Sequence, residues 1–228
     1  MTLQLYYFPT LNGQKVTIAL EEMGLPYDIR MVNILEGDQS KEDFLAINPN
    51  GRIPALIDPD GPAGPVTVFE SAAILQYLGR KSGQFYPQDE ARRAPIDSWL
   101  FWQMAGLGPS SGQVNWFTRV AQKPEMPPEA SEYPLKRFRR ETNRLFGVLE
   151  RGLSGRDYLV EDYSIADMCC WTWIDKYPAN GGGLDDFPNI AAWHARIAER
   201  PAVQRAMMAG LDQLDISEEI KAKWNGKA

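Results

Sequence analysis

The chain is poor in the residues that most often build metal sites and nucleophilic triads, since its 228 residues include two cysteines and one histidine. Cys169 and Cys170 are adjacent, and His194 lies further along the chain. A structural zinc ion ordinarily needs four ligands at defined spacings, so we expect no bound metal. A Ser-His-Asp triad would have to use His194, whose surroundings IAAWHARIAER are more typical of a structural or surface histidine. So few cysteines in so long a chain favour a reducing compartment.

Long apolar runs and an excess of positive charge are also missing. No apolar stretch approaches the roughly 18 to 20 residues that cross a bilayer, so we predict no membrane segment. The opening segment, MTLQLYYFPT, lacks the basic and apolar regions of a secretory signal, which makes the cytoplasm the expected location. The net charge of −6 and the pI near 5.0 argue against a nucleic-acid partner. The one basic cluster, KRFRR at 136–140, lies among acidic residues.

Residues 1–83 alternate short β-rich runs with helical patterns. Apolar residues from Val16 to Met23 recur at the spacing of one helix face, with Asn12 as the expected N-cap and Gly24 as the C-terminal stop. The predicted order is β-α-β-α-β-β-α. The strands are predicted at 3–7, 27–33, 53–58 and 66–69. The helices are predicted at 13–23, over a short segment that ends near residue 47, and at 70–83.

After Gly83 the strand patterns disappear. We predict a domain over 1–83, a linker over 84–90 and an all-helical domain with a charged tail over 91–228. Pro95 must lie in the first turn of its helix, kink that helix or move its start. The run Ser164-Ile165-Ala166-Asp167 has the form of a capping box ahead of an apolar helix. The later helices are predicted at 133–152, 165–177, 189–199 and 202–210, after a first one that carries Ile96 to Met104.

Polar chemistry in the first domain begins with the turn FPTLNGQK, which joins a strand to a helix. The free N–H groups at a helix N-terminus favour an anion. The Thr10 hydroxyl and the Asn12 amide are no strong bases at neutral pH, but both can donate a hydrogen bond to a thiolate. An ordinary N-cap and turn would explain the same residues.

Two further motifs each have a structural and a functional interpretation. In NGRIPAL, Pro54 belongs at a strand start, and a cis bond before it would free the Ile53 backbone to pair with an extended peptide ligand. In FESAAI, Ser71 and the first helical N–H groups could hold a carboxylate, and Glu70 could hold an ammonium group. The simpler interpretations are a trans strand start and a helix cap.

Together these motifs resemble a family. A βαβαββα domain with PNGRIPAL and FESAAILQYL, followed by helices with YSIADMCCW, is similar to the cytosolic glutathione transferases over roughly residues 3–210. The segments PTLNGQKVTIALEEMGLPY, WLFWQMAGLGP and GQVNWF resemble the bacterial Nu class, of disulfide-bond reductase type, and its relative, a fungal prion-forming nitrogen regulator. The resemblance implies an α/β thioredoxin-like N-terminal domain, an all-α C-terminal domain and a homodimer.

The resemblance also implies roles for individual residues. Thr10 and Asn12 would be catalytic, at the glutathione sulfur, and Ile53 before a cis Pro54 would pair with the cysteinyl backbone. The other glutathione contacts implied are Gln39 and Arg52 at the glycyl end, Glu70 and Ser71 at the γ-glutamyl end, and Arg137 from a neighbouring subunit.

The second substrate would meet an aromatic wall of Asn115, Trp116 and Phe117, with Tyr7 as a less favoured hydroxyl. Because the turn offers Thr10 where other classes have Tyr, Ser or Cys, the bound thiol would belong to glutathione itself. We expect reduction of small or glutathione-mixed disulfides, with glutathione or glutathione disulfide as ligand. Conjugation to, or thiolytic cleavage of, a small electrophile is one alternative, and a non-catalytic glutathione-binding regulator is another.

Overall fold

The computed structural model describes residues 2–121, 127–175 and 183–214. They form two compact units: Met1–Pro87 together with the segment that begins at Ala198, and Gln88–Ile197. The boundary after Pro87 lies inside the linker expected at 84–90. The segment from Ala198 was expected in the helical domain, but its described part belongs with the first unit.

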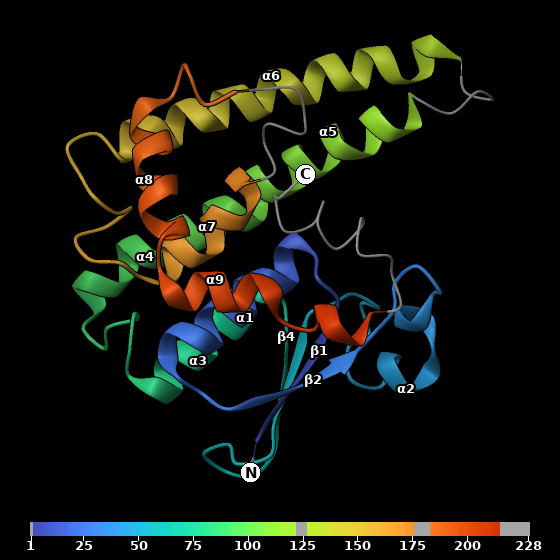
Figure 1. Cartoon of the computed structure of the whole chain (residues 1–228), viewed down its shortest axis with the longest axis vertical. Coiled ribbons are helices and arrows are strands. Elements are labelled where there is room, and N and C mark those ends of the chain that lie inside the picture. Colours follow the sequence, from blue (N-terminus) through green and yellow to red (C-terminus); the bar gives the residue numbers. More distant parts are fainter. Residues whose placement is uncertain (1, 122–126, 176–182, 215–228) are drawn as a thin grey trace. The chain divides into compact units, whose positions relative to one another are not determined.

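The first unit has a four-stranded mixed sheet with helices beside it (Figure 1). Its elements are β1 (Leu3–Tyr7), α1 (Leu11–Met23), β2 (Tyr27–Met31), the 3₁₀ turn η1 (Asp38–Ser40), α2 (Glu42–Leu45), β3 (Ala55–Asp58), β4 (Val66–Phe69), α3 (Ser71–Ser82), α9 (Pro201–Met208) and the 3₁₀ turn η4 (Leu211–Gln213). The predicted order of elements over residues 1–83 is therefore confirmed.

The strand order is β2-β1-β3-β4. β1 runs parallel to β2 and antiparallel to β3, and β3 runs antiparallel to β4. Leu3, Leu5 and Tyr7 are buried, whereas the residues between them are only half-buried, as the period-two geometry of a strand requires. Helices α1 and α3 pack against each other beside this sheet.

Helix α1 begins earlier than the sequence indicated. Thr10 has extended backbone angles and is the N-cap, and its Oγ1 accepts a hydrogen bond from the Gly13 amide at 3.3 Å. Asn12, the expected N-cap, lies inside the first turn of the helix. The C-terminal stop is confirmed, since Gly24 adopts a left-handed conformation with φ 63°.

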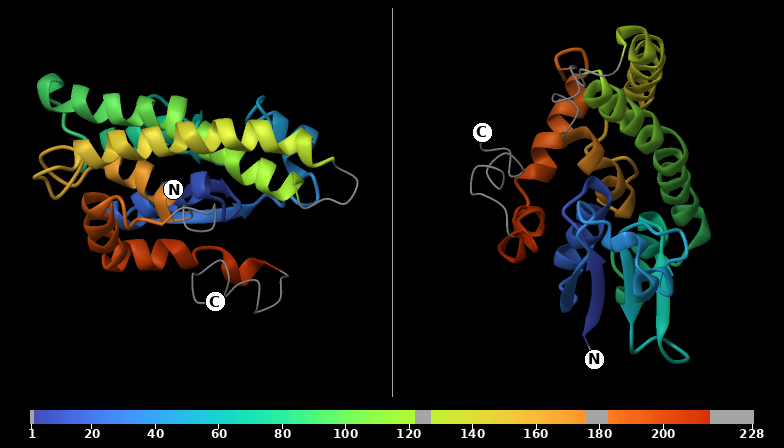
Figure 2. Two further views of the ribbon diagram at one scale, coloured as in Figure 1. Left: turned by 90° about the horizontal axis from the view of Figure 1, so that it is seen from above. Right: turned by 90° about the vertical axis from the view of Figure 1, so that its right-hand side faces the viewer.

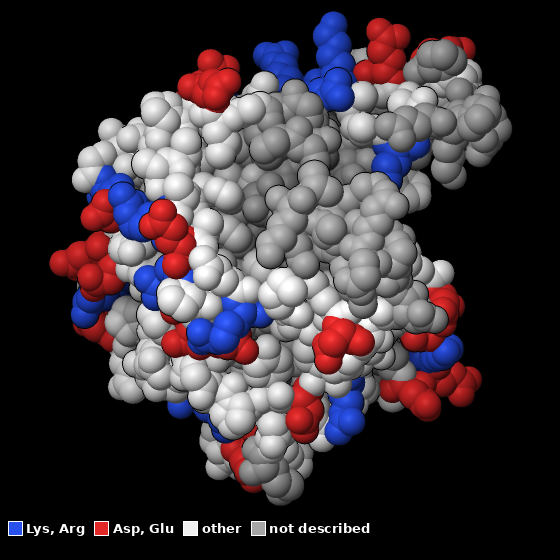
Figure 3. Space-filling view, viewed as in Figure 1, with Lys and Arg blue, Asp and Glu red and all other residues white. Residues whose placement is uncertain are grey.

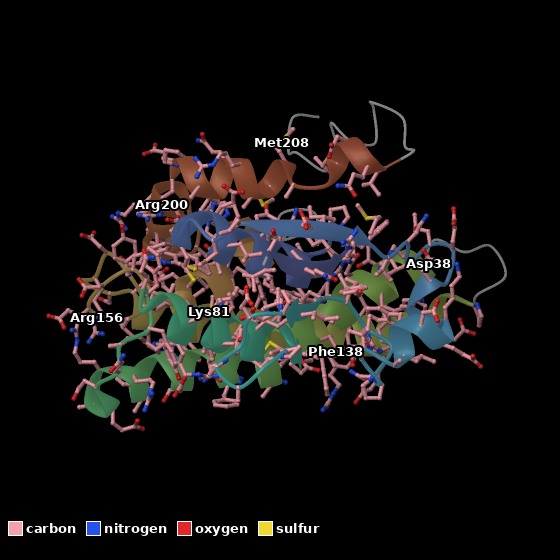
Figure 4. All side chains as sticks on the ribbon, turned by 90° about the horizontal axis from the view of Figure 1, so that it is seen from below. Asp38, Lys81, Phe138, Arg156, Arg200 and Met208 are labelled. Carbon is pink, nitrogen blue, oxygen red and sulfur yellow. The ribbon has the colours of Figure 1, made fainter. Side chains whose placement is uncertain are left out.

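The segment after Ala198 is attached to α1 by ion pairs and a hydrogen bond. Arg200, labelled in Figure 4, binds the Glu22 carboxylate through Nε at 2.6 Å and through a second nitrogen at 2.8 Å. Within α9 itself, the Ala206 carbonyl accepts a hydrogen bond from the Thr17 hydroxyl of α1 at 3.2 Å. These contacts place α9 on α1, within the first unit.

The second unit is helical over its described residues. Its elements are α4 (Glu90–Trp102), the π-helical turn η2 (Gln103–Leu107), α5 (Gly108–Val120), α6 (Pro128–Gly152), α7 (Ile165–Asp175) and α8 (Pro188–Ala198). α5 and α6 lie side by side (Figure 2). Asp89 caps α4 by accepting from the Arg92 amide at 3.0 Å, so Pro95 lies inside the helix, beyond its first turn.

The capping box before α7 is present. Ser164 Oγ accepts from the Ala166 amide at 3.2 Å, and the Asp167 carboxylate accepts from the Ser164 amide at 3.0 Å. Asp167 is fully buried and also accepts from the Leu159 amide at 3.0 Å and from Trp193 Nε1 at 2.9 Å. This one carboxylate therefore joins the loop before α7 to α8.

Among the described residues, no helix is long and apolar enough to cross a membrane. On the face shown in Figure 3, acidic and basic side chains are interspersed rather than gathered by sign. The expectations for residues 176–177 and for the tail beyond residue 214 lie outside the described part of the chain.

Candidate functional site at one edge of the sheet

The sheet topology brings three chain segments to one edge. Tyr6 of β1 pairs with Ala55 of β3, and Ala55 pairs in turn with Phe69 of β4. Because both pairings are antiparallel, the end of β1, the start of β3 and the end of β4 meet there. The three motifs singled out in the sequence, at Thr10, at Ile53 and at Glu70, lie within three residues of these strand ends.

Thr10 presents a half-buried hydroxyl at the N-terminus of α1. Its oxygen accepts from the Gly13 amide, so its single hydrogen is directed away from that bond. The helix N-terminus adds the positive end of the α1 dipole. Asn12, also half-buried, lies in the same turn. A helix N-terminus with such side chains has the chemistry to stabilise an anion, and the role of Thr10 and Asn12 in doing so stays a prediction.

The peptide bond between Ile53 and Pro54 is cis. Ile53 lies two residues before the first residue of β3 and packs against the clusters around Phe8 and Phe44. Within the described part of the chain, no hydrogen bond outside the sheet engages its backbone. The glycyl-end candidates lie close by: a Cβ on Gly51 would come within 3.2 Å of the Gln39 carbonyl, and Arg52 is exposed.

Glu70 has φ 73° and ψ 118°, a rare conformation for a residue with a side chain. Strained backbone of this kind is found preferentially at functional sites. Glu70 is exposed and makes no side-chain cap bond, whereas Ser71 begins α3 and is 2% exposed. The Nζ of Lys15, in α1, donates to Ser71 Oγ at 3.4 Å. Lys15 itself is fully buried, and the sequence analysis did not single it out.

Tyr7 does not fit its assigned role. Its side chain is 0% exposed, and its ring lies so close to Gly13 that an added Cβ there would come within 2.8 Å. Burial raises the pKa of its phenol, and the nearby Thr17 hydroxyl opposes that shift only in part. The hydroxyl is thus a core group, and a direct contact with a second substrate is not supported.

The second-substrate candidates belong to the second unit. Asn115, Trp116 and Phe117 lie on α5, where Trp116 is 56% exposed and the Phe117 ring stacks on Phe138 with centroids 6.1 Å apart. Arg137, on α6, is exposed.

Both cysteines are inaccessible. Cys169 and Cys170 are 0% exposed in α7, and Cys169 Sγ donates to Gln103 Oε1 at 3.3 Å. A buried, hydrogen-bonded thiol in an apolar helix is a packing residue rather than a nucleophile. The described residues also contain no cluster of three or more His, Cys, Asp or Glu that could hold a metal ion.

Comparison with known proteins identifies the family. Residues 11–81 match the glutathione S-transferase N-terminal domain, and residues 112–201 match the glutathione S-transferase C-terminal domain. The chain is 40% identical over 209 residues to the disulfide-bond oxidoreductase YfcG of Escherichia coli, covering 90% of this chain and 94% of that protein. The chain belongs to the glutathione S-transferase family.

Solved structures of glutathione transferases agree with this assignment. One from Burkholderia graminis, with two glutathione molecules bound per subunit, has a TM-score of 0.85 and 42% identity over 92% of this chain and 89% of that one. One from Pseudomonas putida, with one glutathione disulfide bound per subunit, has a TM-score of 0.82 and 40% identity over 90% of each chain. The nitrogen-regulation fragment of the yeast prion protein Ure2p also matches, with a TM-score of 0.82 and 28% identity over 91% of this chain and 96% of that one. The thioredoxin-like and helical domains expected from the sequence are thereby confirmed.

Proposed function

We propose that this protein reduces small or glutathione-mixed disulfides with glutathione, and that it stabilises the glutathione thiolate without a cysteine of its own. The observation that carries the proposal is the burial of both cysteines, 0% exposed in α7, while Thr10 and Asn12 remain half-exposed at the N-terminus of α1. The reacting thiol therefore has to come from the ligand. The similarity to a disulfide-bond oxidoreductase supports this chemistry.

The thiolate would sit at the N-terminus of α1. The Thr10 hydroxyl keeps its oxygen on the Gly13 amide and turns its hydrogen to the sulfur. A hydrogen bond to a charged group contributes about 1.5 to 3 kcal/mol, which corresponds to a lowering of the thiol pKa by roughly one to two units. Asn12 and the helix dipole act in the same direction.

Reduction of a small disulfide consumes two glutathione molecules, whereas a disulfide that already carries glutathione needs only the second of the two steps. The first thiolate attacks one sulfur of the substrate disulfide, so that a mixed disulfide forms and the other sulfur leaves as a thiolate that takes up a proton. A second glutathione thiolate then attacks the glutathione sulfur of the mixed disulfide, which releases glutathione disulfide and the second substrate thiol. The relative from Burkholderia graminis holds two glutathione molecules per subunit, which supports room for both.

The remaining glutathione contacts are proposed from the positions at the sheet edge. The Ile53 backbone pairs with the cysteinyl residue, and Glu70 with Ser71 holds the γ-glutamyl end. Gln39 and Arg52 meet the glycyl carboxylate. We further expect a homodimer in which Arg137 reaches the neighbouring subunit's ligand, and a reducing compartment such as the cytoplasm.

The test is reduction of hydroxyethyl disulfide by glutathione, coupled to glutathione reductase and NADPH. The variant Cys169→Ala/Cys170→Ala should keep the wild-type rate. In Thr10→Val the rate should fall by about tenfold to a hundredfold, which corresponds to the loss of one charge-assisted hydrogen bond. Thr10→Ser retains both the helix cap and the donor and should restore the rate. Loss of activity in a folded cysteine double variant would overturn the proposal.

The exposed Trp116 favours a second candidate function, attack of the bound thiolate on an apolar carbon electrophile. An aromatic wall suits such a substrate. Conjugation of a chloronitrobenzene would then depend on Trp116, with the Trp116→Ala variant losing this reaction but retaining disulfide reduction. Wild-type protein that conjugates quickly but leaves every tested disulfide intact would favour this candidate over the first.

A further inference from the structure

Lys15 is the least expected residue beside the candidate site. Lysines are almost never fully buried, because removing an ammonium from water costs several kcal/mol unless partners compensate. Lys15 nevertheless has a relative exposure of 0% in the middle of α1, and its Nζ lies 3.4 Å from Ser71 Oγ at the first residue of α3. This hydrogen bond connects α1 to Ser71, at the γ-glutamyl end of the proposed glutathione site.

The direction of this hydrogen bond determines what Ser71 can do. An ammonium has only donors, so Lys15 donates and the Ser71 oxygen accepts. The one hydrogen of the hydroxyl is then directed away from Lys15. Ser71 is also the first residue of α3, whose preceding residue, Glu70, makes no side-chain cap bond. A carboxylate at this helix end would meet the hydroxyl hydrogen and the first helical N–H groups, with the buried Lys15 ammonium 3.4 Å from the Ser71 oxygen.

We propose that Lys15 is a positioning residue for the α-carboxylate of the γ-glutamyl end of glutathione. It orients the Ser71 hydroxyl as a donor and raises the positive potential at the N-terminus of α3. The inference rests on the proposed function, since it requires glutathione at this edge of the sheet. It assigns to a residue of α1 a part in ligand recognition that neither its type nor its sequence context indicated.

The role is separable from a general effect on the fold. Charges interact more strongly in a buried setting than in water, so the effect of Lys15 should fall on the one ligand group that carries the matching charge. Removing the ammonium should lower the affinity for glutathione by about tenfold, which is near the lower end of the range for a hydrogen bond to a charged group. The same change should leave unaltered the affinity for a peptide that lacks that carboxylate. A purely structural lysine would weaken both ligands alike.

The experiment is calorimetric titration of the full chain with glutathione and with γ-aminobutyryl-cysteinylglycine, which is glutathione without the α-carboxylate. We compare wild type with Lys15→Met, which keeps an unbranched apolar side chain in the core. Arg80→Met is the matched control, because Arg80 is an exposed cation near the other end of α3. We expect Lys15→Met to lose about tenfold in affinity for glutathione and to keep its affinity for the analogue. Arg80→Met should keep the wild-type affinity for both ligands.

Two further variants keep the proposal testable if Lys15→Met does not fold. Lys15→Gln retains a donor to Ser71 without the charge and should show a smaller loss, again for glutathione only. Ser71→Ala should also affect glutathione more than the analogue. Equal losses for both ligands, or no loss in a folded Lys15 variant, would overturn the role of Lys15. Wild-type protein that binds neither ligand would instead refute the proposed function itself.

Discussion

Replacing Asp167 with asparagine should destabilise the helical unit strongly, because this carboxylate accepts hydrogen bonds on both of its oxygens. Oδ1 accepts from the Leu159 amide and from Trp193 Nε1, and Oδ2 accepts from the amide and the hydroxyl of Ser164. Asparagine has one acceptor oxygen. Whichever way the amide is turned, its NH₂ group would face either the two donors that bond Oδ1 or the two donors that bond Oδ2, and those donors would lose their acceptor.

The magnitude follows from the groups left unpaired. A buried donor without an acceptor costs about 1 to 3 kcal/mol, so one or two of them predict a loss of about 2 to 5 kcal/mol in the free energy of unfolding. The pH dependence adds a second signature. Burial raises the pKa of Asp167 to about 6, although hydrogen bonds from Leu159, Trp193 and Ser164 oppose the shift.

The sign of this effect is fixed by the raised pKa. The folded state binds the Asp167 proton more tightly than the unfolded state, so the stabilisation is complete below the ordinary value of 3.8 and is lost as the pH rises through about 6. About two pKa units correspond to about 3 kcal/mol. Because asparagine does not titrate, the stability difference between wild type and Asp167→Asn should be larger in acid than at neutral pH.

Urea unfolding followed by circular dichroism at several pH values between about 4 and 7 tests both statements, across the window set by the Asp167 pKa. The matched control is Asp186→Asn, which removes an exposed carboxylate and should change stability by no more than about 0.5 kcal/mol. The reasoning is refuted if Asp167→Asn unfolds at the wild-type urea concentration, or if its pH profile runs parallel to that of the wild type.

Two predictions concern the first unit. Gly13→Ala should lower the free energy of unfolding by roughly 1 to 3 kcal/mol, because its Cβ would lie 2.5 Å from the Phe8 carbonyl, and thermal denaturation measures the loss. Burial raises the pKa of Asp58, but hydrogen bonds from Lys81 (Figure 4) and Tyr77 outweigh it and hold the pKa below its ordinary value. The contribution of ionised Asp58 to the free energy of unfolding should therefore be present above pH 3.8, the ordinary pKa, and should be lost as the pH falls below that value. Asp58→Asn should be about 2 kcal/mol less stable near neutral pH and lack this acid limb, and an unchanged acid limb in urea titrations would contradict the assignment.

The elements with strong local signals were predictable. Residues 3–7 alternate as a strand, Gly24 stops α1, and Ser164 caps α7, and all three depend only on neighbouring residues. The N-cap of α1 was misplaced because Thr10 and Asn12 are both good capping residues, and only the backbone angles distinguish them. The π-helical turn at Gln103–Leu107 has no comparable sequence signature.

The rest depended on contacts between distant parts of the chain. Helix α9 was expected with the other helices, but the Ala206 carbonyl in it and the Arg200 side chain just before it both bond to α1, far away in the sequence. Lys15 escaped notice for the same reason: a lysine in a helix is normally solvated, and only the packing of α3 on α1 shows that it is buried. Tyr7 was a candidate because strand alternation alone does not reveal how deeply a hydroxyl is buried.

The central claim is that the protein lowers the pKa of a thiol that it does not own. The most direct measurement is the ultraviolet absorbance of the thiolate of bound glutathione as a function of pH, with S-methylglutathione as the blank, in the Cys169→Ala/Cys170→Ala background. The account predicts a thiol pKa roughly one to two units below that of free glutathione, and a return toward the free value in Thr10→Val. A bound thiol that titrates as in free solution, or a shift that Thr10→Val leaves intact, would contradict it.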